Sequence, residues 1–141
     1  MGSFGAPALF AGSIGAIVTL PTFPLPKSND DEKKARKAAI QSATKHAIEI
    51  PFKVMETVYA SMAIIKDMAV HGNPNSVSDA GVGALCARSA VMGAFLNVKI
   101  NASGLDDKTY VNDILDKASA IEQKTKAMED EILKIVESKI K

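Results

Sequence analysis

The stretch HGNPNSVSDAGVGALCARSA, residues 71–90, decides the fold. Gly72 and Pro74 predict the end of one helix, because glycine is favoured just past a helix and proline cannot continue it. A polar run of asparagine and serine follows, and then a helix built largely from small residues. The stretch therefore predicts two helices joined by a short polar turn, with Asp79 at the start of the second helix.

The residues before this turn predict a helix that begins at Ser28 or Asn29 and ends at the turn. Acidic residues follow the expected cap, where the positive end of the helix dipole favours them. Pro51 lies inside the segment, so we expect a kink or a break in the preceding turn. Three prolines in positions 21–26 separate this helix from residues 6–19, which predict a short helix that is apolar on all sides.

Two helices are predicted after the turn. The first covers about residues 78–99, and Arg88 is the only charged residue of its interior, which indicates a central, buried helix. The second begins with Asp106 as its expected cap and repeats apolar residues every three or four positions. We therefore expect an all-α, up-and-down bundle of about four helices with a long C-terminal amphipathic helix, in a single domain, residues 1–141.

Composition excludes several classes of function. The 141 residues are 47% hydrophobic and 23% charged, which suits a folded core rather than a disordered chain. Seventeen basic and sixteen acidic residues give a net charge of +1, and only 5% of residues are aromatic, so we expect no nucleic-acid partner. The single cysteine, Cys86, fits a reducing, cytoplasmic location, and we expect its side chain to be buried.

The apolar run ALFAGSIGAIVTL, residues 8–20, is a candidate for a membrane-spanning helix or an export signal. It has 13 residues, whereas a spanning helix needs about 20. No basic residue precedes it, which argues against an export signal. We interpret the run as a helix that packs against protein and expect no membrane partner; membrane association through these residues is the weaker alternative.

Small side chains share one face of the helix after the turn. At about 100° per residue, this face holds Asp79, Gly83, Cys86, Ala90, Gly93 and Asn97. Close packing of helices is the simpler interpretation of such a stripe, and a ligand groove is the alternative. Asp79 and Asn97 are separated by about 27 Å of helix, so they do not act on the same atom within one chain.

Three quoted motifs carry a resemblance to a known family: GNPN at 72–75, SD at 78–79 and NVKIN at 97–101. Over about residues 25–137 the chain resembles the cyclodeaminase/cyclohydrolase family of folate enzymes. That family includes formimidoyltetrahydrofolate cyclodeaminase and methenyltetrahydrofolate cyclohydrolase. The resemblance implies an all-α bundle that is usually dimeric, with a reduced folate as substrate and with neither a tightly bound cofactor nor a metal.

The resemblance also implies a reaction. In the cyclodeaminase, N10 attacks the formimino carbon and ammonia leaves, giving 5,10-methenyltetrahydrofolate. In the cyclohydrolase, water adds to the methenyl bridge and gives 10-formyltetrahydrofolate. By position, Asp79 would bind substrate or assist proton transfer. The implied substrate-binding residues are Asn73, Pro74, Asn75, Ser78, Asp79, Asn97 and Asn101, of which the last two would be secondary binding or packing groups.

The chain departs from the family pattern near its start. Family members carry a glycine-rich loop and an aspartate motif assigned the main acid/base role, and neither has a full counterpart here. Residues 1–24 resemble a divergent or truncated first helix, and residues 25–141 are the family-like region. The sequence holds no Asp, Glu or His between Met1 and Lys27. A catalytically impaired folate-binding protein, or an oligomerisation partner of a full-length paralogue, is therefore the alternative function.

A shortened bundle also bears on assembly. Removing one helix from a bundle exposes apolar surface of the neighbouring helices to water. This exposure costs about 25 cal/mol of free energy for each Å² of apolar surface. Several hundred Å² would cost on the order of ten kcal/mol, comparable to the stability of a whole domain. We therefore expect a homodimer or a higher homo-oligomer.

Overall fold

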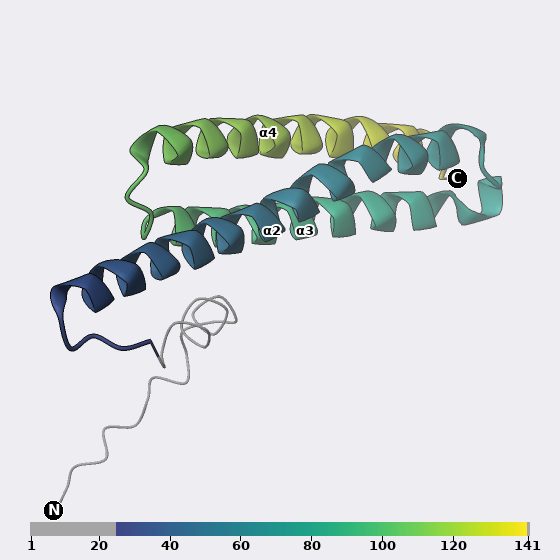
Figure 1. Cartoon of the computed structure of the whole chain (residues 1–141). Coiled ribbons are helices and arrows are strands. Elements are labelled where there is room, and N and C mark those ends of the chain that lie inside the picture. The colour runs from purple at the N-terminus through teal and green to yellow at the C-terminus, as the bar shows by residue number, and fades with distance from the viewer. Residues whose placement is uncertain (1–24, 141) are drawn as a thin grey trace, which may run out of the picture.

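Three long helices form the part of the protein that the structure, a computed structural model, describes: residues 25–140 (Figure 1). In chain order the elements are α2 (Asp30–His71), the short 3-10 helix η1 (Pro74–Ser76), α3 (Val77–Ala102) and α4 (Lys108–Lys139). No strand occurs among these residues, so the all-α prediction is confirmed for them. The helix expected at residues 6–19 lies outside the described residues, so three of the four expected helices are seen.

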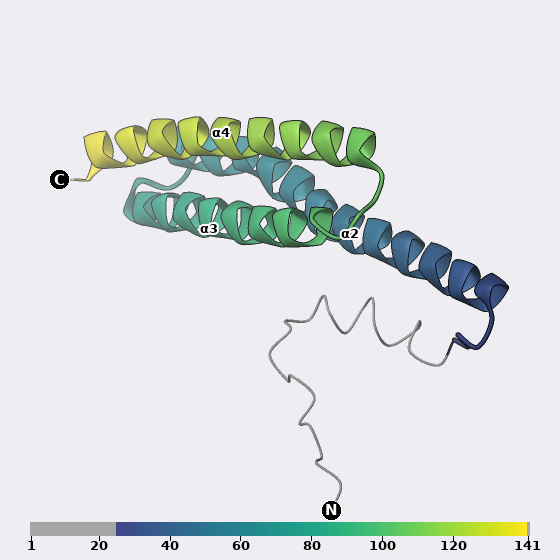
Figure 2. The same ribbon diagram turned by 90° about the vertical axis from the view of Figure 1, so that its left-hand side faces the viewer.

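The helices run up and down, each antiparallel to the one before it (Figure 1). α3 packs against both α2 and α4, and the N-terminal turns of α2 project past the ends of the other two helices (Figures 1 and 2). Eight of the buried apolar residues belong to α3, because the other two helices pack against it. The core consists of Ala47, Ile48, Met55, Met62 and Ala69 of α2, Val77, Ala80, Ala84, Ala87, Val91, Ala94, Val98 and Ala102 of α3, Leu105 of the following loop, and Val111, Ile114, Ala118, Ile132 and Val136 of α4.

Asn29 is the cap that begins α2. Its Oδ1 accepts from the backbone N–H of Glu32 at 2.9 Å, while the Glu32 carboxylate accepts from the Ser28 N–H at 2.7 Å. This reciprocal pair satisfies two backbone donors at the helix start, as in a capping box. Of the two expected caps, the structure selects Asn29.

Pro51 does not break α2, which is continuous from Asp30 to His71. Of the kink or break expected here, the break is wrong, because the backbone acceptor that the proline leaves free finds another donor. In an α-helix the N–H at position 51 would donate to the Ala47 carbonyl, and proline has no N–H. The Asn101 amide of α3 donates to that carbonyl instead, at 3.0 Å.

In the loop between α3 and α4, a second expectation, the residue that caps the last helix, is wrong. The cap of α4 is Asp107, whose side chain accepts from the Tyr110 N–H at 3.0 Å, and not Asp106. Asp106 pairs instead with Lys37 of α2 at 2.8 Å, and this partner lowers the pKa of the Asp106 carboxyl. Two adjacent aspartates are equivalent candidates in sequence, and only the position of α2 distinguishes them. Gln41 of α2 also holds the loop, accepting from the Asp106 N–H at 2.7 Å.

A cluster of three charged side chains joins α3 to α4. Arg88 of α3 lies 2.6 Å from Glu122 and 3.4 Å from Glu129, both on α4. The three side chains are only 13% to 24% exposed. Arg88 therefore compensates the negative charge of two largely buried carboxylates between α3 and α4.

We expected α3 to be a central, buried helix, and this prediction is wrong for one side of the helix. Two neighbouring helices cover only part of its circumference, and large apolar residues of α3 on the other side stay exposed, among them Val82 (58%) and Leu96 (66%). Cys86, expected to be buried, is exposed for the same reason.

We predict that Arg88→Met lowers the free energy of unfolding by about 3 kcal/mol, because it leaves Glu122 and Glu129 unpaired in a mostly buried position. The matched control is Lys117→Met, which removes an exposed ion pair with Asp113 and should cost about 0.5 kcal/mol or less. Urea titration followed by circular dichroism at 222 nm measures both. Equal losses in the two variants would contradict this account of the cluster.

Candidate functional site

The turn between α2 and α3 begins at Gly72, the C-cap of α2. The Gly72 N–H donates to the Met68 carbonyl at 2.9 Å, and its backbone is extended rather than left-handed. A Cβ at this position would collide with the Met68 carbonyl oxygen. Glycine is therefore required here by close approach of the backbone to the last turn of α2.

Asn73 shapes the rest of the turn. Its side-chain Oδ1 accepts from the Asn75 N–H at 3.0 Å, and its backbone carbonyl accepts from the Ser76 N–H at 2.9 Å. These two bonds fold η1 and leave the Asn73 Nδ2 group as a donor for something else. Ser76 is the N-cap of α3, yet its hydroxyl makes no capping bond. The turn therefore keeps polar groups that its own folding does not use.

A cavity of about 390 Å³ lies beside this turn, between the last turns of α2 and the first turns of α3. Its wall is mostly apolar, and its polar groups come from the turn and the start of α3. The lining residues are Ile64, Ile65, Met68, Gly72, Asn73, Ser76, Asp79, Ala80 and Gly83. An apolar pocket with a few polar groups on one side is the usual form of a small-molecule site.

Among the residues 25–140 that line the cavity, Asp79 is the only ionisable one. It lies in the first turn of α3, close to the positive end of the helix dipole, which favours a carboxylate there. Within residues 25–140 no side chain forms an ion pair with it. The cavity thus offers one carboxylate that is not committed to another group of the described chain.

The structure brings together only some of the residues that the sequence singled out. Asn73 and Asp79 line the cavity. Pro74 and Asn75 belong to η1 and Ser78 to the first turn of α3, and these three residues do not line it. Their assignment as substrate-binding residues stays a prediction. The α2 wall was missed, because the packing of α2 on α3 is not visible in the order of residues along the chain.

Asn97 and Asn101 lie far from the cavity, near the opposite end of α3. The Asn97 amide donates to the Gly93 carbonyl at 3.2 Å, within its own helix. The buried Asn101 amide donates to Ala47 of α2 and to the Asn97 carbonyl. Of the two roles expected for this pair, the packing role accounts for the contacts of Asn101.

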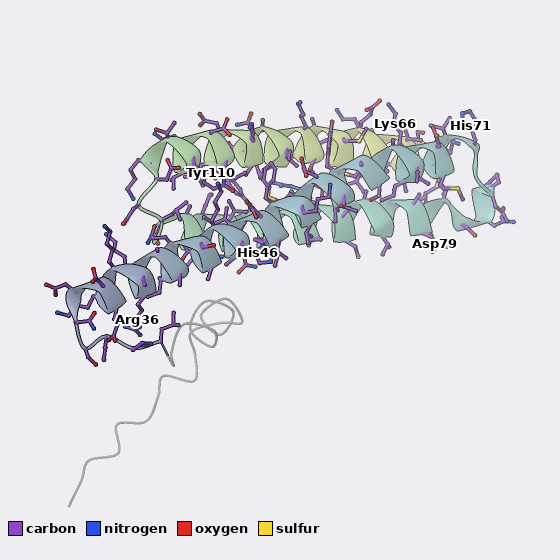
Figure 3. The ribbon with its side chains drawn as sticks, in the orientation of Figure 1. Arg36, His46, Lys66, His71, Asp79 and Tyr110 are labelled. Atoms are coloured by element: carbon purple, nitrogen blue, oxygen red, sulfur yellow. The ribbon has the colours of Figure 1, made fainter. Side chains whose placement is uncertain are left out.

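The remaining candidates for chemistry lie apart from the cavity. Figure 3 shows Asp79 and His71 at the same end of the bundle and His46 well along α2 from them. His71 is exposed at the end of α2 and does not line the cavity. In the described ranges, no group of three or more His, Cys, Asp or Glu side chains is arranged to hold a metal ion.

Known proteins match this chain over most of its length. A family model described as formiminotransferase-cyclodeaminase matches residues 19–120. A methenyltetrahydrofolate cyclohydrolase of Methylorubrum extorquens is 36% identical over 116 residues, which is 82% of this chain and 56% of that protein. The formimidoyltransferase-cyclodeaminase of Rattus norvegicus is 29% identical over 130 residues, which is 92% of this chain and 23% of that protein. The chain therefore spans about half of the bacterial relative and about a quarter of the animal one.

We predict that Gly72→Ala lowers the free energy of unfolding by about 1–3 kcal/mol, because the added methyl group forces the turn away from Met68. Gly104→Ala is the matched control, since a Cβ there meets its nearest atoms at 3.6 and 3.8 Å, which are ordinary contacts. Thermal unfolding of the two variants at one protein concentration measures the difference. A loss no larger at position 72 than at position 104 would contradict the close-approach account.

Proposed function

Because the chain belongs to the formiminotransferase-cyclodeaminase family, we propose that it binds a reduced folate beside the turn from Asn73 to Asp79 and acts on its one-carbon unit. The single observation that carries the proposal is the cavity at this turn, in which Asp79 is the only ionisable lining residue. Family membership supports the substrate class in this proposal, and the cavity supports its location.

The cavity suits the pteridine end of a folate. Its volume of about 390 Å³ falls in the usual range for small-molecule sites. Ile64, Ile65 and Met68 offer an apolar wall for a flat ring system. The amino-pyrimidinone edge of a pterin carries N–H donors, and the Asp79 carboxylate is an acceptor of two such bonds. The pterin ring would thus contact the apolar wall, and its amino-pyrimidinone edge would donate hydrogen bonds to Asp79 in the same cavity.

Two reactions fit this arrangement. In hydrolysis, water adds to the C=N bond of the methenyl bridge, the water loses a proton, and ring opening gives 10-formyltetrahydrofolate. In cyclodeamination, N10 of 5-formimidoyltetrahydrofolate attacks the formimino carbon. The formimino nitrogen gains two protons, one released by N10 and one from solvent, and the bond from the carbon to this nitrogen breaks as ammonia leaves. Asp79 is the group in the cavity that can accept a proton in either reaction, or it can hold the substrate by hydrogen bonds while solvent carries the proton.

A second function is favoured by a specific observation. Among residues 25–140, no other ionisable side chain lines the cavity to act with Asp79. The alternative is therefore a protein that binds reduced folate without turnover, or one that pairs with a full-length paralogue. This alternative predicts that the chain binds folate but does not convert it.

The test is the change in absorbance of 5,10-methenyltetrahydrofolate near neutral pH, together with ammonia release from 5-formimidoyltetrahydrofolate. We expect the full chain to raise one of these rates above buffer and Asp79→Asn to lower kcat/KM by about 100-fold or more. Asp116→Asn, which changes an exposed aspartate on α4, is the matched control and should leave the rate unchanged. A fall in kcat alone indicates proton transfer, and a rise in KM alone indicates substrate binding.

Titration calorimetry with tetrahydrofolate separates the two functions. Binding that Asp79→Asn weakens, without turnover by the unaltered chain, supports the binding protein over the enzyme. If the chain neither binds tetrahydrofolate nor turns over either substrate, the turn from Asn73 to Asp79 is not a folate site.

A further inference from the structure

A second cavity, with a volume of about 340 Å³, lies beside the first turns of α2. Figure 3 shows Arg36 in this region and Asp79 at the opposite end of the bundle. Among the described residues, those that line the cavity are Lys27, Lys33, Arg36, Lys37 and Ile40. We call the first four of them the basic cluster. About 36 Å of α2 separates Ile40 from Ile64, the nearest residue of α2 in the cavity beside Asp79, so the two cavities are separate sites.

One face of α2 and the segment before it form the basic cluster. At about 100° per residue, positions 33, 36, 37 and 40 lie within an arc of about 100° around the helix. Residues 25–29 run back along the first turns of α2 (Figures 1 and 2), which brings Lys27 to the same cavity. These turns project past the other two helices, so the basic cluster does not serve the packing of the core.

Positive charge gathers around this cavity. Residues 27–37 hold five basic and three acidic residues, which leaves a net charge of +2, whereas the whole chain carries +1. Of the acidic residues, Glu32 is engaged at the start of α2, where it accepts from the Ser28 N–H. Lys33 lies three positions from Arg36 and four from Lys37, and like charges at these spacings destabilise a helix. The arrangement is therefore unfavourable unless negative charge compensates it.

Two carboxylates provide part of that compensation. Asp30 lies 3.0 Å from Lys33, and Asp106 of the loop before α4 lies 2.8 Å from Lys37. The four side chains of these pairs are 61% to 97% exposed, and exposed ion pairs are weak, so both lysines can turn to another anion. Lys27 forms no ion pair with any residue of 25–140. The basic cluster and these two carboxylates together carry a net charge of +2.

We propose that the basic cluster binds the phosphate group of a phosphomonoester, either a small molecule or a lipid headgroup of the same chemistry. A phosphomonoester carries about −1.5 to −2 charge near pH 7, which matches the positive charge of the wall, whereas a single carboxylate carries −1. The proposal does not rest on the folate function proposed above, because the two cavities are separate.

The geometry of the donors suits a phosphate group. Its three terminal oxygens accept hydrogen bonds from several directions at once. The Arg36 guanidinium carries five N–H donors and can bind two phosphate oxygens side by side, while the lysine ammonium groups act as point charges around them. The donors come both from α2 and from the segment before it, so they surround the cavity on more than one side.

The test is titration calorimetry of the full chain with glycerol 3-phosphate at low ionic strength, compared with the double variant Lys27→Gln, Lys33→Gln. Both lysines are exposed, so the double variant should keep its circular dichroism spectrum. We expect the unaltered chain to bind and the double variant to bind about tenfold more weakly or worse.

The matched control is the double variant Lys124→Gln, Lys126→Gln. It removes the same charge at exposed positions of α4 that do not line the cavity. Its affinity should stay within about twofold of that of the unaltered chain, because charges so far away are screened. An equal loss in the two double variants, or no loss in the first, overturns the proposal.

Two further probes identify the ligand chemistry. Phosphatidic acid presents the same phosphomonoester in a lipid, so sedimentation of the chain with phosphatidylcholine vesicles that contain it, and not with phosphatidylcholine alone, assigns the lipid source. Binding of glycerol 3-phosphate assigns the small-molecule source, and either result supports the proposal when only the first double variant loses it. Glutarate, a dicarboxylate of similar charge, should bind about tenfold more weakly or worse, because its charge is divided between two separate groups. Equal affinity for glutarate, or no binding of either phosphate probe, overturns the proposal, and none of these assays involves folate.

Discussion

The hydrogen bond from Asn101 to the Ala47 carbonyl is the constraint on which the bundle depends. Pro51 removes the N–H that would satisfy this carbonyl, and Ala47 is only 2% exposed, so water does not replace it. A buried carbonyl without a donor costs about 1–3 kcal/mol. Asn101 supplies the donor at 3.0 Å and thereby lets α2 continue as a single helix of 42 residues.

The candidate site follows from that continuity. Because α2 does not end at Pro51, its last turns reach the first turns of α3 and form the apolar wall of the cavity. Lys139 of α4 secures the same end of α2, donating to the Ala69 carbonyl at 2.9 Å. The distant Asn101 thus contributes to the site through the path of α2.

The local parts of this architecture could be predicted from the sequence. Gly72 and Pro74 stop one helix, Asn29 begins another, and the apolar period of α4 shows its buried side, because each signal acts within a few residues. Interactions between distant positions could not be predicted in this way. The sequence did not show that α2 continues through Pro51, because Asn101, which donates to the Ala47 carbonyl, is 54 positions away from Ala47. Asp106 and Asp107 are equal as caps until Lys37 is placed beside one of them.

For the candidate site too, the local features could be predicted from the sequence, and the contacts between distant residues could not. The polar turn and Asp79 were found from the sequence, since turn residues and helix caps are local. The α2 wall was missed, because its residues are separated from Asp79 by the turn and face it only after folding. The small-residue stripe predicted close packing, and the structure leaves part of that stripe without a neighbour in the described chain. Such a stripe identifies a surface for close approach but not the molecule that approaches.

A double-mutant cycle tests the role of Asn101 most directly. Asn101→Ala is made in the natural chain and in Pro51→Ala, which restores a backbone N–H for the Ala47 carbonyl, and unfolding is measured at one protein concentration. The account predicts a loss of about 2–3 kcal/mol in the natural chain and about 1 kcal/mol less in the Pro51→Ala background. Equal losses in both backgrounds would show that Asn101 does not replace the donor that Pro51 lacks.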